Sequence, residues 1–118
     1  MIVVGLLVFL GGVIGVLLGG SSGSSANVVK MRRYSFDPRV LTVSRGATVR
    51  FENVSGTDKW PASNFHPTHQ LYPGFDAAHT LRNGESYSFK FERVGRWGYH
   101  DHLSPNIQAT IVVTTTKR

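Results

Sequence analysis

The chain has 118 residues, with 13 Lys and Arg against 7 Asp and Glu, 5 His and no Cys. This length allows one domain and leaves little room for a second. The lack of cysteine excludes disulfide bonds, a thiolate nucleophile, an iron–sulfur cluster and a thiolate-ligated blue copper centre. The formal net charge of +6 permits attraction to nucleic acid or anionic lipid.

The N-terminal segment is apolar and carries no charged side chain, and its run of apolar residues extends from Ile2 to Leu18. As a helix that rises about 1.5 Å per residue, this run just reaches across a hydrocarbon core of about 30 Å. We therefore predict that residues 1–19 form a transmembrane anchor or signal segment with a hydrophobic helix. Residues 20–27 are rich in Gly and Ser and are predicted to form a flexible linker.

The basic residues around this segment and its length favour opposite orientations in a membrane. No Lys or Arg precedes the apolar run, and the nearest basic residues, Lys30, Arg32 and Arg33, follow it. The positive-inside rule would keep that following side in the cytoplasm. The length and composition of the segment nevertheless favour export, with the domain membrane-anchored or secreted, in the periplasm or at the cell surface.

Residues 28–116 are predicted to form one all-β domain. Val49 and Phe51 alternate with polar residues, as do Phe89 and Phe91, and turn signals such as Asn83-Gly84 separate the runs. Short alternating strands at this spacing predict an antiparallel β-sandwich or barrel. The expected core consists of apolar residues from these strands: Phe36, Val43, Val49, Phe51, Phe89, Phe91, Ile111 and Val113.

Four of the five histidines occur in two pairs, His66 with His69 and His100 with His102. In a strand, residues two apart point to the same face, so His100 and His102 can act together. Neutral imidazole suits copper and zinc, and the two pairs predict a metal site if the sandwich brings them together. Asp101 points the other way and would be a ligand only if the strand ends or bends there. His79 has no partner in the sequence and is expected to be an ordinary surface residue.

The same region carries a series of motifs in a fixed order. They are Phe36-Asp37-Pro38, Leu41-Thr42-Val43, Gly46, Thr48-Val49-Arg50-Phe51, Asn53, His69, Gly84-Glu85-Ser86, Tyr99-His100 and Ala109 to Val113. The series resembles the cupredoxin family of plastocyanin and azurin type, over roughly residues 28–113. The resemblance implies a Greek-key β-sandwich, and it places His69 where the family has its first copper-ligating histidine.

The ligand set departs from that family. Asp101 stands where cupredoxins have the copper-binding cysteine, and Ile107 lies in the region of their axial methionine. A blue copper site needs one thiolate and two imidazoles, so this chemistry is not available. The stretch from Trp97 to His102 is similar to the histidine motif that ligates non-blue copper in multicopper oxidases, although their other copper motifs are absent.

The leading hypothesis is an exported cupredoxin-like protein, not an enzyme, that binds type 2-like copper, with zinc as the other metal. The ligands are predicted as His69 and His102 first, His100 and His66 next, and Asp101 as an oxygen ligand. Such a site favours copper capture, storage or delivery over rapid electron transfer. Its partners would be the metal ion, the membrane through the N-terminal segment, and a redox or copper-transfer protein that the sequence does not identify.

Two other functions remain open, and a third is not expected. The domain could be a metal-free interaction module with a binding surface around Trp60, Phe65, Tyr72 and Phe75. A hydrolytic zinc site built from three His and a water is chemically conceivable. Nucleic-acid binding is not expected, because the basic residues are spread along the strands and no basic-plus-aromatic motif stands out.

Overall fold

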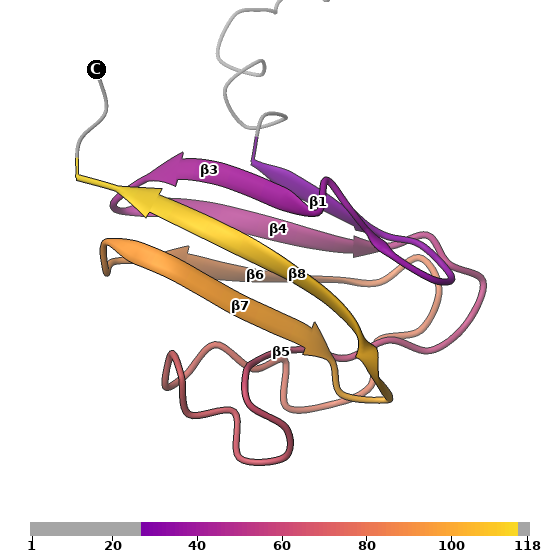
Figure 1. Ribbon diagram of the computed structural model, residues 1–118. Coiled ribbons are helices and arrows are strands. Elements are labelled where there is room, and N and C mark those ends of the chain that lie inside the picture. The colour runs from indigo at the N-terminus through magenta and orange to yellow at the C-terminus, as the bar shows by residue number, and fades with distance from the viewer. Residues whose placement is uncertain (1–26, 116–118) are drawn as a thin grey trace, which may run out of the picture.

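Strands form where the sequence alternates between apolar and polar residues. The computed structural model describes residues 27–115, and in this range it contains eight strands (Figure 1). They are β1 (Val28–Met31), β2 (Phe36–Asp37), β3 (Val40–Ser44), β4 (Ala47–Asn53), β5 (Pro61–Ser63), β6 (Ser86–Phe91), β7 (Gly95–Asp101) and β8 (Ser104–Thr114). The predicted all-β fold is confirmed.

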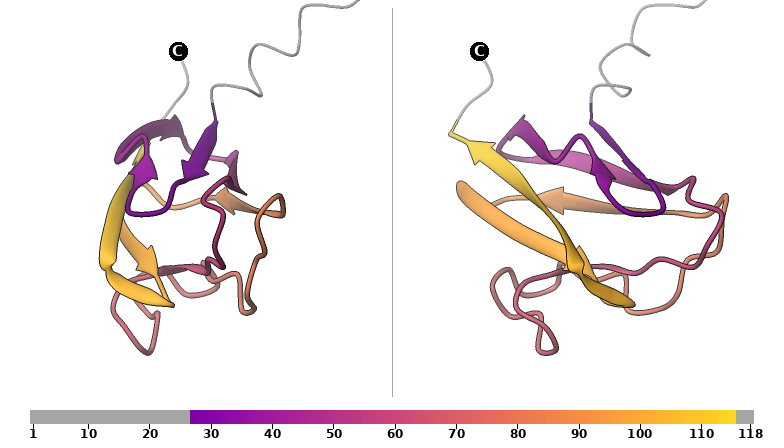
Figure 2. Two further views of the ribbon diagram at one scale, coloured as in Figure 1. Left: turned by 90° about the vertical axis from the view of Figure 1, so that its right-hand side faces the viewer. Right: turned by 45° about the vertical axis from the view of Figure 1, so that its right-hand side comes forward.

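The strands make two four-stranded sheets, ordered β2-β1-β4-β6 and β3-β8-β7-β5, and the views in Figure 2 show them as two layers. Two pairings are parallel, β1 with β4 and β3 with β8, whereas the pairings of β4 with β6 and of β7 with β8 are antiparallel. The chain therefore crosses between the layers from β2 to β3 and again from β3 to β4. The predicted β-sandwich is present, but its pairing is mixed rather than purely antiparallel.

The core between the sheets is rich in aromatic side chains. Seven of the eight predicted core residues are buried, and Phe89 is partly buried against them. Tyr99 lies at the centre, with its ring 5.0 Å from that of Phe36 and 5.4 Å from that of Phe51. Burial raises the pKa of the Tyr99 hydroxyl well above its ordinary value. Fully burying a Phe side chain such as Phe36 contributes about 1.5–3 kcal/mol to folding.

The connection between β5 and β6 positions half of the candidate site. Figure 1 shows the loops after β5 beside the lower edge of the sandwich. Phe75, in this connection, is fully buried, and its carbonyl accepts a hydrogen bond from the Ser63 N–H. The Leu71 N–H donates to the Asn64 carbonyl at 2.7 Å and closes the loop that carries His66 and His69. The loop is therefore tied to the core at its base.

Residues 27–115 include no helix that is long and apolar enough to cross a membrane. The predicted anchor, residues 1–19, and residues 20–26 of the predicted linker lie outside the described residues. Both remain predictions.

Candidate metal centre

The fold brings the two histidine pairs together. His66 and His69 come from the β5–β6 connection, His100 from the end of β7, and His102 from the residue after β7. One ring nitrogen from each of these four side chains lies within 4.8 Å of the other three. We call these four residues the histidine cluster. The sheet register shifts between His100 and Asp101, and this irregularity lies where the cluster forms.

His69 is held by a contact with the partly buried carboxylate of Asp76. Its Nδ1 lies 2.8 Å from Oδ2 of Asp76, and the side chain is buried. Burial raises the pKa of Asp76, but hydrogen bonds from the Trp60 ring, His69 and the Ala78 N–H outweigh it and lower the pKa below its usual value. The ionised carboxylate therefore accepts a hydrogen bond from Nδ1 of His69 and orients the ring so that Nε2 faces His102 in the cluster.

His100 supplies the clearest sign that the site suits a metal. Its Nδ1 lies 2.9 Å from Oδ1 of Asn64, whereas its buried Nε2 has no hydrogen-bond partner within residues 27–115. Burial and the neighbouring histidines lower the pKa of His100 to about 4, so the ring is neutral near pH 7. An unpartnered buried nitrogen is costly. A metal bond to the Nε2 lone pair would satisfy it.

His102 lies between His69 and Trp60. Its Nδ1 is 3.2 Å from Nε2 of His69, and its ring centroid lies 4.4 Å from that of Trp60. The indole N–H of Trp60 donates to Oδ1 of Asp76 at 2.7 Å. Trp60 therefore connects the carboxylate that holds His69 to the ring of His102. The roles of Asp76 and Asn64 could not be predicted from the sequence, because the loop that contains them has no periodic pattern.

His66 is exposed and completes the cluster from the solvent side. Its ring centroid lies 4.9 Å from that of His102, 5.4 Å from that of His100 and 6.1 Å from that of His69. All four residues of the predicted histidine set thus lie in one place.

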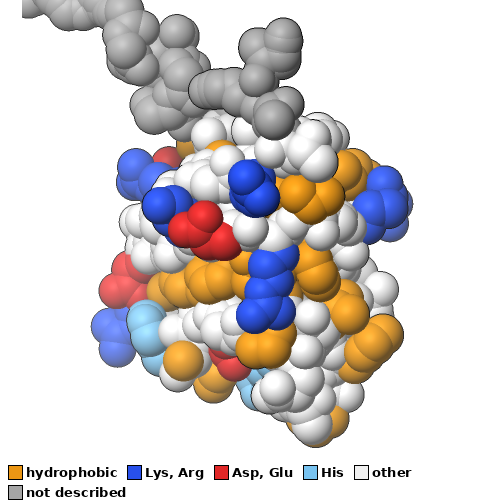
Figure 3. All heavy atoms as spheres, turned by 90° about the vertical axis from the view of Figure 1, so that its left-hand side faces the viewer, with side chains coloured by type: hydrophobic (Ala, Val, Ile, Leu, Met, Phe, Trp, Pro, Cys, Tyr) orange, Lys and Arg blue, Asp and Glu red, His pale blue; other side chains and the backbone are white. Residues whose placement is uncertain are grey.

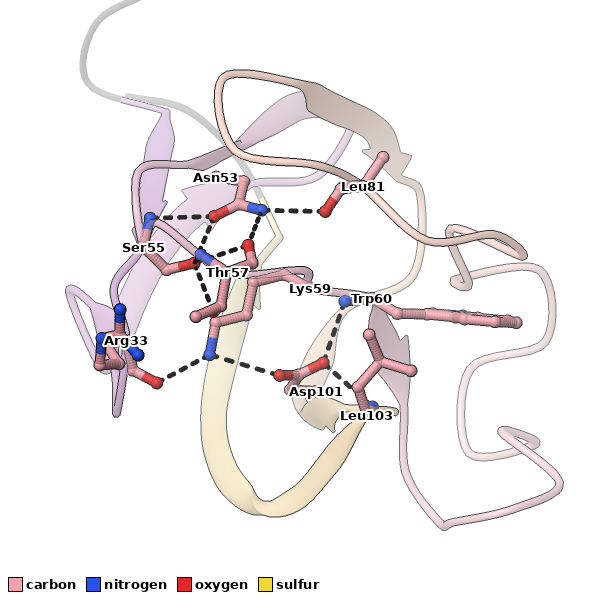
Figure 4. Close-up of polar contacts among 9 residues, drawn as sticks. All are labelled: Arg33, Asn53, Ser55, Thr57, Lys59, Trp60, Leu81, Asp101 and Leu103. Carbon is pink, nitrogen blue, oxygen red and sulfur yellow. Dashed lines mark hydrogen bonds and ion pairs between the residues drawn. The ribbon is translucent and has the colours of Figure 1, made fainter.

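Asp101 does not join the cluster, which corrects its inclusion among the predicted ligands. Figure 4 shows its carboxylate directed toward Lys59, with an Oδ2 to Nζ distance of 3.3 Å. Its Oδ1 accepts the N–H groups of Trp60, at 2.9 Å, and Leu103, at 3.1 Å. Both charged side chains are buried, at 1% exposure for Asp101 and 2% for Lys59. Strand alternation turns Asp101 away from its histidine neighbours, and Lys59 holds it there.

His79 also lies outside the cluster, as the sequence predicted. Its side chain is exposed and its Nδ1 lies 3.0 Å from the Thr80 carbonyl oxygen. His79 therefore provides a matched control for substitutions in the cluster.

The cluster offers only nitrogen ligands. Nε2 of His100 has no partner within residues 27–115, and Nε2 of His69 faces Nδ1 of His102 at 3.2 Å, so these three nitrogens are the candidate metal-facing atoms. Two ligand atoms on opposite sides of one ion lie about 4 Å apart, because each metal–nitrogen bond is about 2.0–2.1 Å long. The four nitrogens therefore need only small movements to hold one copper or zinc ion.

The low pKa of His100 predicts a pH dependence of folding stability in the metal-free protein. An unfolded His binds a proton near its ordinary pKa of about 6.5, whereas the folded His100 does so only at about 4. Stability is then fully present above about pH 6.5 and is lost as the pH falls toward about 4. Urea unfolding at pH 7 and pH 4.5 should show a loss of about 1–2 kcal/mol from this group. The same loss in His100→Gln would contradict the assignment.

The fold and the cluster together define a cupredoxin-like β-sandwich with a histidine-only candidate metal centre. No protein-family model matches the chain, and no curated protein matches its sequence. Solved structures do match. A purple cupredoxin from Nitrosopumilus maritimus has a TM-score of 0.65 at 18% identity, covering 74% of this chain and 98% of that one.

Two further matches are similar in strength. Amicyanin from Paracoccus versutus has a TM-score of 0.61 at 17% identity, covering 74% of this chain and 79% of that one. A copper-containing nitrite reductase from Thermus scotoductus has a TM-score of 0.64 at 24% identity, covering 76% of this chain and 22% of that one. At these identities the likeness shows the cupredoxin fold.

Proposed function

We propose that this protein binds copper through His69, His102, His100 and His66 and serves in copper capture, storage or delivery. The observation that carries the proposal is the histidine cluster, with its buried and unpartnered Nε2 of His100. Imidazole nitrogens bind copper strongly, and copper(II) has the highest affinity in the divalent series. The copper named for the similar nitrite reductase supports the choice of metal.

The absence of cysteine supports a role in binding and transfer of copper. With nitrogen ligands alone the copper site should be of type 2 and weakly coloured. Copper(I) and copper(II) prefer different geometries, and a site with one exposed ligand can rearrange when the metal is reduced. That favours binding and transfer of the ion over rapid electron transfer.

We further propose that the domain works outside the cytoplasm, tethered or exported by residues 1–19. The support is the apolar run and the Gly/Ser linker in the sequence. On the face shown in Figure 3, Lys and Arg side chains are separated by other side chains and form no continuous basic patch.

Equilibrium dialysis of the full chain against copper(II) and against zinc(II) tests the proposal. One tightly bound copper ion per chain is expected, and copper at 100 times the dissociation constant should stabilise the fold by about 2.7 kcal/mol. A metal-free interaction module would bind no stoichiometric copper and would show no rise in melting temperature. Preferential retention of zinc would replace copper as the assigned metal.

A further inference from the structure

The four histidines differ in how firmly they are held. His69 contacts Asp76 at 2.8 Å, and His100 contacts Asn64 at 2.9 Å. His102 packs against the Trp60 ring, with centroids 4.4 Å apart. Each of these three rings therefore has a partner that fixes its orientation independently of a metal.

His66 has no such partner. Its ring meets the other three histidine rings, but it makes no hydrogen bond or ion pair to any residue between 27 and 115. The residues around it, Phe65, Pro67 and Thr68, are exposed as well. The base of the loop is closed by the hydrogen bond from the His69 N–H to the Phe65 carbonyl at 2.8 Å. The loop is thus closed at its base, whereas the His66 side chain is held by ring contacts alone.

We propose that His66 is the exchange ligand of the site. It is the ligand that dissociates from the ion first on release and binds to it last on capture. The proposal rests on the proposed copper function and adds the route of metal transfer. Three oriented rings retain the ion while His66 swings into solvent. An incoming nitrogen or sulfur ligand from a copper acceptor then takes the open position, so that the copper passes by ligand exchange.

The chemistry of this step is a substitution at the metal without a change of oxidation state. The bond from copper to the His66 nitrogen breaks, the bond to the incoming ligand forms, and the His66 lone pair becomes free to hydrogen-bond with water. The side-chain position fits this role, because His66 is the only exposed member of the cluster while His69 and His100 are buried.

The test compares His66→Ala, His100→Ala and the control His79→Ala in the full chain loaded with one equivalent of copper(II). Release to a coloured chelator is followed by stopped-flow absorbance. Loss of one tethered ligand should speed release from His66→Ala on the order of tenfold or more, while one copper per chain is still bound. His79→Ala should behave as the unmodified chain does.

Added imidazole provides a second readout by paramagnetic resonance. In His66→Ala the vacated position faces solvent, so imidazole should restore the nitrogen couplings of the unmodified protein and slow release. In His100→Ala the vacated position is buried, and imidazole should restore little. Circular dichroism establishes that each variant is folded.

Three results would overturn the inference. Unchanged release and unchanged nitrogen couplings in His66→Ala would show that His66 is not a ligand. Complete loss of copper from His66→Ala would show that it is as essential as the buried rings. Failure of the unmodified chain to bind copper would instead reject the proposed function, and this inference with it.

Discussion

Copper affinity should fall by more than about 100-fold when His69 is replaced by Ala, a larger loss than removal of an outer-sphere partner causes. His69 is buried, its Nδ1 is engaged by Asp76, and its Nε2 lies 3.2 Å from Nδ1 of His102. Its removal eliminates one ligand atom and also the carboxylate that acts through it. Isothermal titration of His69→Ala with copper(II) measures the effect.

The matched control for this substitution is His79→Ala, which removes an exposed imidazole outside the cluster. Its copper affinity should equal that of the unmodified chain. His69→Ala must also keep its β-sheet circular dichroism spectrum, so that lost binding is not lost folding. A folded His69→Ala that retains full copper affinity would remove His69 from the ligand set.

The second large effect concerns stability rather than metal binding. Lys59→Ala should lower the free energy of unfolding by about 3–5 kcal/mol, because it leaves the buried Asp101 carboxylate without its cation. The Lys59 Nζ lies 3.3 Å from the Asp101 carboxylate and donates to the Arg33 carbonyl at 2.9 Å, as Figure 4 shows. Urea unfolding monitored by Trp fluorescence gives the difference.

An exposed ion pair in the same protein provides the control. Lys90 lies 3.3 Å from the Glu92 carboxylate, and both side chains are 60% exposed. Lys90→Ala should change the free energy of unfolding by less than about 1 kcal/mol. Equal effects of Lys59→Ala and Lys90→Ala would mean that the buried pair does not stabilise the fold.

Much of the fold follows from periodicity. Alternation at Val49 and Phe51 predicts a strand with one buried face, and both residues are fully buried in β4. The buried residues of the β5–β6 connection could not be predicted in this way. Phe75 lies in an aperiodic, Pro- and Gly-containing stretch, and only the folded connection places it in the core.

Some residues of the candidate site could be predicted from the sequence and others could not. Residue type and spacing single out the two histidine pairs, because an imidazole side chain can ligate a metal in any kind of local structure. Their hydrogen-bond partners could not be predicted from the sequence, because Asp76 is seven residues from His69 and Asn64 is 36 residues from His100. Asp101 shows the converse. Its place beside two histidines suggests a ligand, but Lys59, brought close only by the fold, holds the carboxylate on the opposite side.

The most direct test of the proposed copper site is the paramagnetic resonance spectrum of the full chain loaded with one equivalent of copper(II), recorded together with its visible absorption. A nitrogen-only site predicts a type 2 paramagnetic resonance spectrum with couplings to several nitrogens and no intense visible absorption band. An intense blue or purple colour, or no binding at micromolar copper, would contradict it.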